Sequence, residues 1–344
     1  MEIKEFAQNI KQNYPVDKIL SILEKFRPIK TLVIGEIIID EYHFTIPKGR
    51  AIKDPILSVD YVHHETYGGG AIAIANHISN FVNDVTLLSL VGDREDRIEF
   101  IRECLNPNIS TKFFVKKDSP TITKKRYLNQ LRNEKLFKVE YINDSPINEK
   151  LEREILAFLE SQLPDFDLVI VGDFGHGFIN QNIINLLEEK SKYLTVNVQC
   201  NSANLGFNLA TKYNSASYVT MDMKEIQYTT GDRFSDIPTL MMKLKERTNF
   251  GKFLVTMGYG GAMYHYNGNI FSSPAFVKRP VDTVGAGDAV FAITSLLAYT
   301  KDDMILPFIA NCVGGIAVSY IGNKDTITKE KLLSFIQELY DGVE

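Results

Sequence analysis

Short apolar runs rich in β-branched residues recur along the chain, and their alternation with helix-like segments is the strongest constraint on its fold. The runs lie at residues 31–40, 85–93, 167–174, 194–199, 218–221 and 252–258. Segments with helical periodicity lie between them, at 71–81, 178–191 and 235–247. Strands that are apolar on both faces favour a parallel sheet covered by helices on both sides. The sequence therefore predicts an α/β fold that binds its ligands at the carboxyl ends of the strands.

Two regions, 42–66 and 109–142, interrupt this alternation. Within the second, "TKKRYLN" and "KLFKVEYI" interleave charged and apolar residues and flank the polar segment "QLRNE". Such alternation is typical of antiparallel strands with one wet face. We therefore expect a small β-lid from these two regions. It would be an excursion from a single domain of residues 29–344, which follows a helical extension at 1–28.

The composition fits a soluble globular protein, since 44% of the 344 residues are hydrophobic and 24% are charged. The net charge of −5 provides no basic footprint for nucleic acid. The longest apolar stretch, near 289–299, is too short to cross a bilayer, and the N-terminal residues lack the apolar core of a signal peptide. The three cysteines fit neither a disulfide framework nor a zinc ribbon. We expect a cytoplasmic protein with no nucleic-acid or membrane partner.

The stretch "RPVDTVGAGDAVFAITSLLAY" (279–299) places glycines directly before a hydrophobic helix. Glycines at such a junction let backbone N–H groups approach an anion, and the helix N-terminus adds a favourable dipole. In a functional interpretation, the N–H groups of Gly285, Ala286 and Gly287 stabilise charge on a transferred phosphoryl group, and Asp288 is the base. In the alternative, Asp288 only complements the helix dipole. The stretch is not a Walker A loop, because no Gly-Lys-Ser/Thr follows.

The string "DTVGAGD" (282–288) resembles the C-terminal signature of the PfkB, or ribokinase-like, carbohydrate kinases, and the resemblance runs from about residue 31 to 340. It implies a three-layer αβα fold with a mostly parallel sheet. It also implies an enzyme that uses ATP and Mg²⁺ to phosphorylate a sugar or sugar phosphate, with K⁺ beside the signature left open. The resemblance makes Asp288 the general base and Gly285–Gly287 the anion hole.

Two segments, 119–142 and "GDFGHG" (172–177), are most similar to the kinase half of bifunctional ADP-heptose synthases. Those enzymes phosphorylate a heptose 7-phosphate at the anomeric position. The resemblance therefore implies an acceptor of the D-glycero-D-manno-heptose 7-phosphate type, used to make an activated sugar for cell-surface polysaccharide. Those relatives carry a nucleotidyltransferase after the kinase, and we expect another polypeptide, or a longer chain, to supply that step.

The candidate residues fall into two groups. Those expected at the acceptor are Asp40, Gly69, Gly70, Asn76, Lys124, Arg126, Asp173 and His176. Those expected at the nucleotide are Asp222, Glu225, Thr256, Gly258, Gly261, Thr283 and Asn311. The resemblance implies that Asn311 lies beside adenine. It also implies that Asp222 and Glu225 hold the nucleotide's magnesium through water.

The sequence departs from the family pattern mainly on the acceptor side. The altered positions are Glu36 for Asp, Ala73 for Asn, His176 for Lys and Asp222 for Asn. Asn76, one helical turn beyond Ala73, could take over the missing amide. An amide-rich loop at 197–208 replaces an Asp-Pro-Lys turn. Two alternatives therefore stay open, namely a kinase for a nucleoside or other small alcohol, and a non-catalytic sugar-phosphate binder.

Several features also have simpler interpretations. Lys124 and Arg126 share one face of a strand, and could be either phosphate contacts or solvated lid cations. The spacing of Asp222 and Glu225 fits a helix cap equally well. The adjacent pair at 63–64, two histidines, points to opposite strand faces and predicts lid surface rather than a metal site. Exposed lid edges need cover, which predicts a homodimer through the β-lid.

Overall fold

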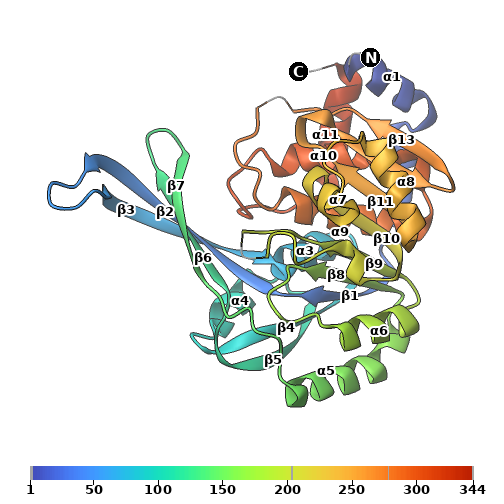
Figure 1. The fold of residues 1–344 in the computed structure, drawn as a ribbon. Helices are drawn as coiled ribbons and strands as arrows, with labels where there is room; N and C mark the ends of the chain where they lie inside the picture. Colours follow the sequence, from blue (N-terminus) through green and yellow to red (C-terminus); the bar gives the residue numbers. More distant parts are fainter. Residues whose placement is uncertain (1–2, 203, 278, 343–344) are drawn as a thin grey trace.

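The computed structural model describes residues 3–342 except 203 and 278, and Figure 1 shows an α/β body with a β-sheet arm projecting from it. Within the described residues, nine strands form the body sheet in the order β13-β12-β11-β10-β9-β8-β1-β4-β5. Their bounds are β1 (Lys30–Gly35), β4 (Asp84–Arg94), β5 (Ile109–Pro120), β8 (Leu168–Asp173), β9 (Leu194–Val198), β10 (Ser215–Asp222), β11 (Asn249–Thr256), β12 (Ala262–Tyr266) and β13 (Asn269–Ser273). In this described sheet the pairs β11–β12 and β12–β13, at one edge, are antiparallel, and the other pairs are parallel.

Helices cover both faces of the body sheet. The helices on one face are α5 (Glu149–Gln162), α6 (Gln181–Lys190), α7 (Met223–Thr230) and α8 (Ile237–Arg247). Those on the other are α1 (Ile3–Asn13), α2 (Val16–Glu24), α3 (Ala71–Ser79), α4 (Ile98–Cys104), α9 (Ala286–Thr300), α10 (Leu306–Ala317) and α11 (Lys329–Asp341). Along β1, Leu32 and Ile34 pack into the first layer and Val33 into the second. The side chains from Thr31 to Ile34 are all buried, on one face or the other. Helices therefore cover both faces of the sheet, and the predicted three-layer α/β fold is confirmed.

Short 3-10 turns complete the connections, at Leu163–Asp165, Ala210–Lys212, Gly258–Gly260 and Asp303–Ile305. At the N-terminus, α1 and α2 pack on α11, and the Phe6 ring lies 6.3 Å from Phe276 and 6.4 Å from Phe308. The N-terminal helices therefore share the core of the body. No helix among the described residues is both long enough and apolar enough to span a membrane.

The prediction of a single strand at 31–40 is wrong, because the chain breaks at Glu36. The Glu36 carboxylate accepts the N–H groups of Phe174 (3.1 Å) and His176 (3.0 Å), and its carbonyl accepts that of Ala71 (3.0 Å). These bonds turn the chain out of the body sheet. After the turn, β2 (Ile37–Arg50) leaves the body and enters the lid.

The lid comprises β2, β3 (Leu57–Gly70), β6 (Thr123–Asn129) and β7 (Glu134–Tyr141), in the order β3-β2-β6-β7. The strands β2 and β6 pair in parallel, whereas the outer pairs are antiparallel. The assignment of the whole of 109–142 to the lid is wrong, since 109–120 forms β5 and pairs parallel with β4 at the edge of the body sheet. An edge strand has one wet face, which explains why its sequence alternates like a lid strand.

Candidate active site

The signature stretch forms a tight turn followed by α9. Gly285 stands at the N-cap with φ of 84°, in the left-handed region that favours glycine. A side chain at this position would also collide with that of Asn323. The helix that follows is almost wholly buried from Asp288 to Ala298. The first N–H groups of a helix have no partner inside it. This turn therefore places a potential anion site at the start of a rigid, buried helix.

Two neighbouring cavities meet at this helix start. The first, of about 290 Å³, lies between the lid and the carboxyl ends of the body strands. The second, of about 510 Å³, extends along α9 and α10. The residues that line both are Asp222, Thr256, Thr283, Gly287 and Val290. A ligand bound in one cavity can therefore contact a ligand bound in the other, across the signature turn.

Asp288 lies on the wall of the first cavity and is 7% exposed. Its Oδ1 accepts a hydrogen bond of 2.6 Å from Nε2 of Gln199. Burial raises the pKa of Asp288 to about 7, although the bond from Gln199 opposes the shift. A carboxyl group with a pKa near neutrality, facing a cavity, is suited to accept a proton from a bound hydroxyl.

The lid contributes charge to the opposite wall of the first cavity. Asp40 on β2 and Lys124 on β6 are paired neighbours, and Arg126 forms an ion pair with Asp40. Lys124 is 7% exposed, and burial lowers its pKa, whereas nearby Asp40 raises it. Both cations line the cavity, so they are not simply solvated lid residues.

Gly69 and Gly70 end β3 beside Asp40, and Gly70 lines the first cavity. Gly70 has φ of +58°, and a side chain at Gly69 would overlap the Asp40 carboxylate. The glycine pair therefore leaves room for Asp40 to face the cavity.

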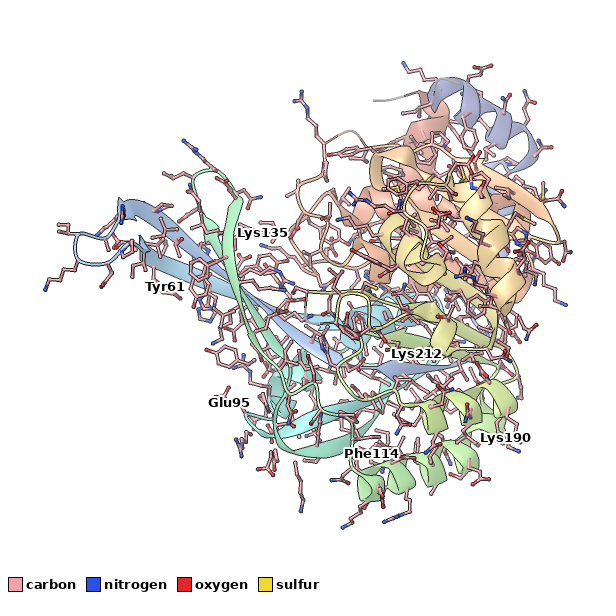
Figure 2. The ribbon with its side chains drawn as sticks, in the orientation of Figure 1. Tyr61, Glu95, Phe114, Lys135, Lys190 and Lys212 are labelled. Atoms are coloured by element: carbon pink, nitrogen blue, oxygen red, sulfur yellow. The ribbon has the colours of Figure 1, made fainter. Side chains whose placement is uncertain are left out.

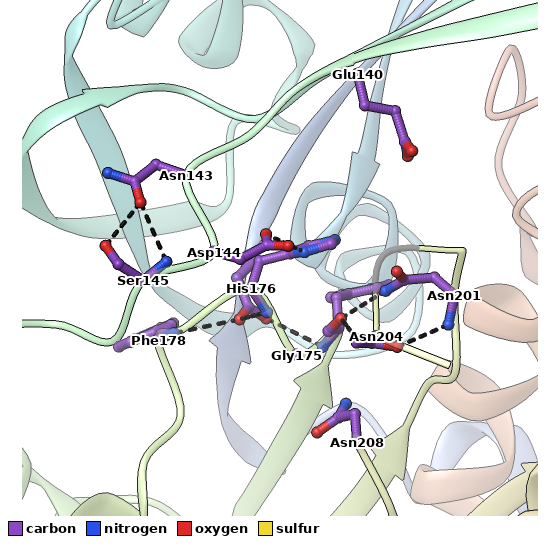
Figure 3. A network of polar contacts seen from close by, with 12 residues as sticks. Glu140, Asn143, Asp144, Ser145, Gly175, His176, Phe178, Asn201, Asn204 and Asn208 are labelled. Carbon is purple, nitrogen blue, oxygen red and sulfur yellow. Dashed lines mark hydrogen bonds and ion pairs between the residues drawn. The ribbon is translucent and has the colours of Figure 1, made fainter. Parts of the chain in front are cut away.

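Asp173 and His176, predicted at the acceptor, are not among the residues that line this cavity. His176 is buried, with Nδ1 2.9 Å from Asp144 and Nε2 3.4 Å from Nζ of Lys124, and Figure 3 shows His176 beside Asp144. Asp173 is fully buried and contacts Lys212 (2.5 Å) and the hydroxyl of Tyr213 (2.8 Å). A buried carboxylate needs such partners, and they hold the Asp173 side chain away from the first cavity. His176 contacts Lys124, which does line the cavity.

The structure does not bring Asn76 to the site. Its Nδ2 donates to the carbonyl of Cys104 (2.8 Å), and its Oδ1 accepts from the N–H of Asn106 (3.0 Å). Because α3 is buried along its whole length, this amide must find partners nearby, and the 104–106 segment supplies them. It therefore does not replace the amide missing at Ala73.

The second cavity collects the remaining candidates. Its lining includes Thr256, Gly258, Gly261, Thr283 and Asn311. Its wall is largely apolar, with Phe276 and Val277 from the segment between β13 and α9, Ala310 from α10 and Val318 directly after α10. The side-chain amide of Asn311 donates to the carbonyls of Ser273 and Pro307, both at 3.1 Å. An apolar slot with few polar groups suits the flat base of a nucleotide.

Asp222 and Glu225 form a capping box at the start of α7. Oδ1 of Asp222 accepts the N–H of Glu225 (2.7 Å), and Oε2 of Glu225 accepts the N–H of Asp222 (2.8 Å). Oε1 of Glu225 accepts the N–H of Cys200 (3.0 Å), and burial raises the pKa of Glu225 to about 8. The capping interpretation of the sequence is therefore confirmed.

These residues do not form a metal cage of their own. Among the described residues, no group of three or more His, Cys, Asp or Glu side chains could hold a metal ion. Asp222 nevertheless lines both cavities where they meet. This donor set fits Mg²⁺, which keeps several waters and binds phosphate together with one or two carboxylates.

Sequence reasoning missed several residues of the first cavity, among them Asn197, Gln199, Asn201, Thr220 and Asn323. The amide-rich loop at 197–208 stands out in the sequence, but no local pattern assigns its members to partners. Asn201 and Asn204 of this loop donate to the carbonyl of Phe174, both at 2.8 Å, and so attach the loop to the segment that carries His176 (Figure 3).

The fold and the site define a phosphoryl-transfer enzyme, and the family comparison agrees with them. Residues 29–330 match the pfkB family of carbohydrate kinases, so the chain belongs to that family. It is an ATP-dependent carbohydrate kinase.

Curated relatives confirm the predicted resemblance to the kinase part of a bifunctional enzyme. The bifunctional protein HldE of Helicobacter hepaticus is 24% identical over 312 residues, which cover 89% of this chain and 64% of that protein. HldE of Histophilus somni is 27% identical over 310 residues, which cover 89% of this chain and 63% of that protein. The chain thus spans less than two thirds of the curated relatives it matches.

Solved structures confirm the ribokinase-like fold. Phosphofructokinase-2 from Escherichia coli, in complex with potassium, has a TM-score of 0.69 at 15% identity, covering 90% of this chain and 99% of that one. Ribokinase from Thermotoga maritima has a TM-score of 0.68 at 14% identity, with the same coverage of both chains.

Proposed function

We propose that this kinase phosphorylates a hydroxyl of a sugar phosphate of the D-glycero-D-manno-heptose 7-phosphate type. The observation that carries the proposal is the position of Asp288. Its buried carboxyl group lies at the start of a glycine-led helix and faces a cavity that Lys124 and Arg126 line from the lid. A base, an anion site and cations for a second anion are the parts that phosphoryl transfer to a phosphorylated sugar needs.

In this proposal the acceptor binds in the first cavity and ATP binds in the second. Asp40 contacts the sugar hydroxyls, and Lys124 and Arg126 face the acceptor's own phosphate. Asp288 accepts the proton of the attacking hydroxyl. The N–H groups of Gly285–Gly287 stabilise the charge that develops on the moving phosphoryl group.

Magnesium belongs to the same proposal. Asp222 and Glu225 would hold its water shell, and the ion would neutralise the nucleotide's phosphates. We also propose to test K⁺, because the E. coli phosphofructokinase-2 relative binds potassium. Stimulation of turnover by K⁺ over equal concentrations of choline would support a monovalent site.

The charge of the first cavity favours a sugar phosphate over a nucleoside. Lys124 and Arg126 are both largely buried there, and a neutral acceptor would leave them with only carboxylates to compensate their charge. The amide-rich loop supports the alternative, a nucleoside or other small alcohol, since Asn197, Gln199 and Asn201 also line this cavity. An ATP-consumption assay with the heptose 7-phosphate, fructose 6-phosphate and adenosine separates the two.

The experiment on the base compares Asp288→Asn with the unchanged chain, using ATP and the heptose 7-phosphate. We expect turnover to fall by about two to four orders of magnitude, because the amide cannot accept the proton. Asp118→Asn is the matched control, since the Asp118 side chain is 83% exposed on the edge strand β5 and does not line either cavity, and it should retain normal turnover. Near-normal turnover of Asp288→Asn would contradict the proposal, and tight acceptor binding without ATP consumption by the unchanged chain would favour a non-catalytic binder.

We further propose a homodimer formed through the outer face of the lid. On that face the rings of His64, His43, Tyr127 and Phe137 stack across the strands, with centroid distances of 5.1, 4.7 and 4.6 Å. Phe137 is 45% exposed and Tyr61, labelled on the arm in Figure 2, is 58% exposed. A second lid would cover both the rings and the exposed strand edges.

A further inference from the structure

We propose that Gln199 is a positioning residue, which holds Asp288 by one carboxylate oxygen and leaves the other for the acceptor hydroxyl. The inference rests on the proposed role of Asp288 as the base. Gln199 follows β9 directly, at the carboxyl end of the body sheet, and lines the same cavity as Asp288. Its backbone N–H donates to the carbonyl of Asp173 (2.9 Å), which fixes the start of the side chain.

The direction of the Gln199 amide follows from a chain of hydrogen bonds. The carbonyl of Thr220 can only accept, and it receives Nδ2 of Asn197 at 3.0 Å. Asn197 therefore presents Oδ1 to Gln199, whose Nε2 lies 3.0 Å away. The second N–H of the same nitrogen points to Oδ1 of Asp288 at 2.6 Å. The backbone thus fixes the NH₂ group of Gln199 toward the base.

This bond has consequences for the chemistry. As the acceptor oxygen bonds to phosphorus and the bond to the departing ADP breaks, the hydroxyl proton passes to Asp288. Because Oδ1 already accepts from Gln199, Oδ2 is the oxygen that receives the proton. A hydrogen-bond donor on Oδ1 also favours the ionised form of Asp288. It therefore lowers the pKa of this carboxyl group, which burial raises. Gln199 therefore orients the base and, together with Lys124, lowers its pKa against the effects of burial and of nearby Asp40.

The kinetic test uses Gln199→Met, which keeps the length of the side chain but removes the donor, with ATP and the heptose 7-phosphate. We expect kcat/KM at pH 7 to fall about 10- to 100-fold. We also expect the acidic limb of its pH profile to move up by about one unit. Gln199→Glu should move the limb further, because a second carboxylate disfavours ionisation of Asp288. A fall in kcat/KM that is equal at all pH values would overturn the inference.

A second measurement needs no acceptor. In protein labelled with ¹³C at aspartate, the side-chain carboxyl signal of Asp288 is the one missing from Asp288→Asn. We expect its titration midpoint to be higher in Gln199→Met than in the unchanged chain. An unchanged midpoint would overturn the inference. This titration decides the point even where another sugar is the true acceptor.

Asn204→Ala is the matched control. Its amide lies in the same loop but donates to the carbonyl of Phe174, not to Asp288. The midpoint of Asp288 should stay in place in this variant. If it moves as far as in Gln199→Met, loop distortion explains the effect and the inference fails. Normal turnover of Asp288→Asn instead contradicts the proposed base, so the two failures are distinguishable.

Discussion

At the scale of single residues, partners decide what a buried carboxyl group does. Burial is the main cause that raises the pKa of Glu36 to about 7, of Glu225 to about 8 and of Asp288 to about 7. Glu36 and Glu225 accept backbone N–H groups with both oxygens and so organise loops. Asp288 receives a single side-chain donor and faces a cavity. Glu225 lines the same cavity, but both of its oxygens are taken by backbone N–H groups. A group with a raised pKa is therefore a candidate for catalysis only where it can still bind the ligand.

The raised pKa of Asp288 predicts a pH-dependent cost in stability. The folded pKa of about 7 lies above the ordinary value of 3.8, so folding favours the protonated carboxyl group. This contribution is present in full below pH 3.8 and is lost as the pH rises through 7. Asp288→Asn should therefore be more stable than the unchanged chain above pH 7, by at most about 4 kcal/mol.

Thermal unfolding at pH 5 and pH 8 measures this difference. The gap in Tm between Asp288→Asn and the unchanged chain should be clearly larger at pH 8 than at pH 5, because at pH 5 the folded carboxyl group is still protonated and only part of its contribution to stability has been lost. Asp118→Asn again serves as the control, and its gap should not change with pH. A gap that is the same at both pH values would mean that Asp288 is not protonated on folding.

At the scale of elements, Asp282 connects the lid to the signature turn. Its carboxylate accepts from the hydroxyl of Tyr42 on β2 (3.0 Å) and from the N–H of Val284 (3.2 Å). It also forms an ion pair of 2.5 Å with Lys135 on β7, and Figure 2 shows Lys135 on the projecting lid. Two lid strands therefore hold the residue that precedes the anion site. We therefore expect any movement of the lid to alter the shape of the glycine turn through this carboxylate.

Lys135→Met tests this link. The Lys135 side chain is 40% exposed, so the loss of the ion pair should lower the free energy of unfolding by less than about 1 kcal/mol. We nevertheless expect KM for the acceptor to rise several-fold, because the lid is released. Amide hydrogen exchange of residues 134–141 and 283–288 should become faster.

Lys48→Met is the control for this prediction, since Lys48 pairs with Asp60 (2.8 Å) within the β2–β3 hairpin and not with the body. It should change neither the acceptor KM nor exchange in the signature turn. If both variants behave alike, the contact between Lys135 and Asp282 does not hold the lid.

At the scale of the whole molecule, the site exists because two sheets meet. The body supplies Asp288 and the glycine turn, and the lid supplies Asp40, Lys124 and Arg126. Neither sheet encloses the first cavity by itself. We propose that residues 29–344 are the kinase domain and that 1–28 are an N-terminal extension, whose helices α1 and α2 pack on the body.

The proposed dimer predicts a change of assembly on Phe137→Glu. A charge in the stacked rings of the lid's outer face would have to be desolvated in the interface, so the dimer should dissociate. Light scattering should give twice the chain mass of 39.0 kDa for the unchanged protein and the chain mass for the variant. Phe234→Glu, at a site that is 91% exposed and away from the lid, should stay dimeric. A monomeric unchanged chain would contradict the prediction.

The alternation of apolar strands and helices was enough to predict the three layers, and the string at 282–288 was enough to predict a glycine turn before a buried helix. Both predictions depend on residues that are close in the sequence. A run of apolar residues indicates a strand buried on both faces, and a glycine before a helix indicates a turn with positive φ. The spacing of Asp222 and Glu225 likewise offered the capping box as one of two interpretations, and the structure contains it.

Tertiary structure alone decided which polar groups face the cavity. Asn76 and Asp173 carry suitable side chains, but nearby segments satisfy them away from it. Gln199 reaches Asp288 across 89 positions of sequence, and residues 109–120 join the body because β4 offers a free edge. Which hydrogen-bond partners a polar group finds, and which strand edge a segment joins, depend on how distant segments pack together. Such packing leaves no local pattern in the sequence.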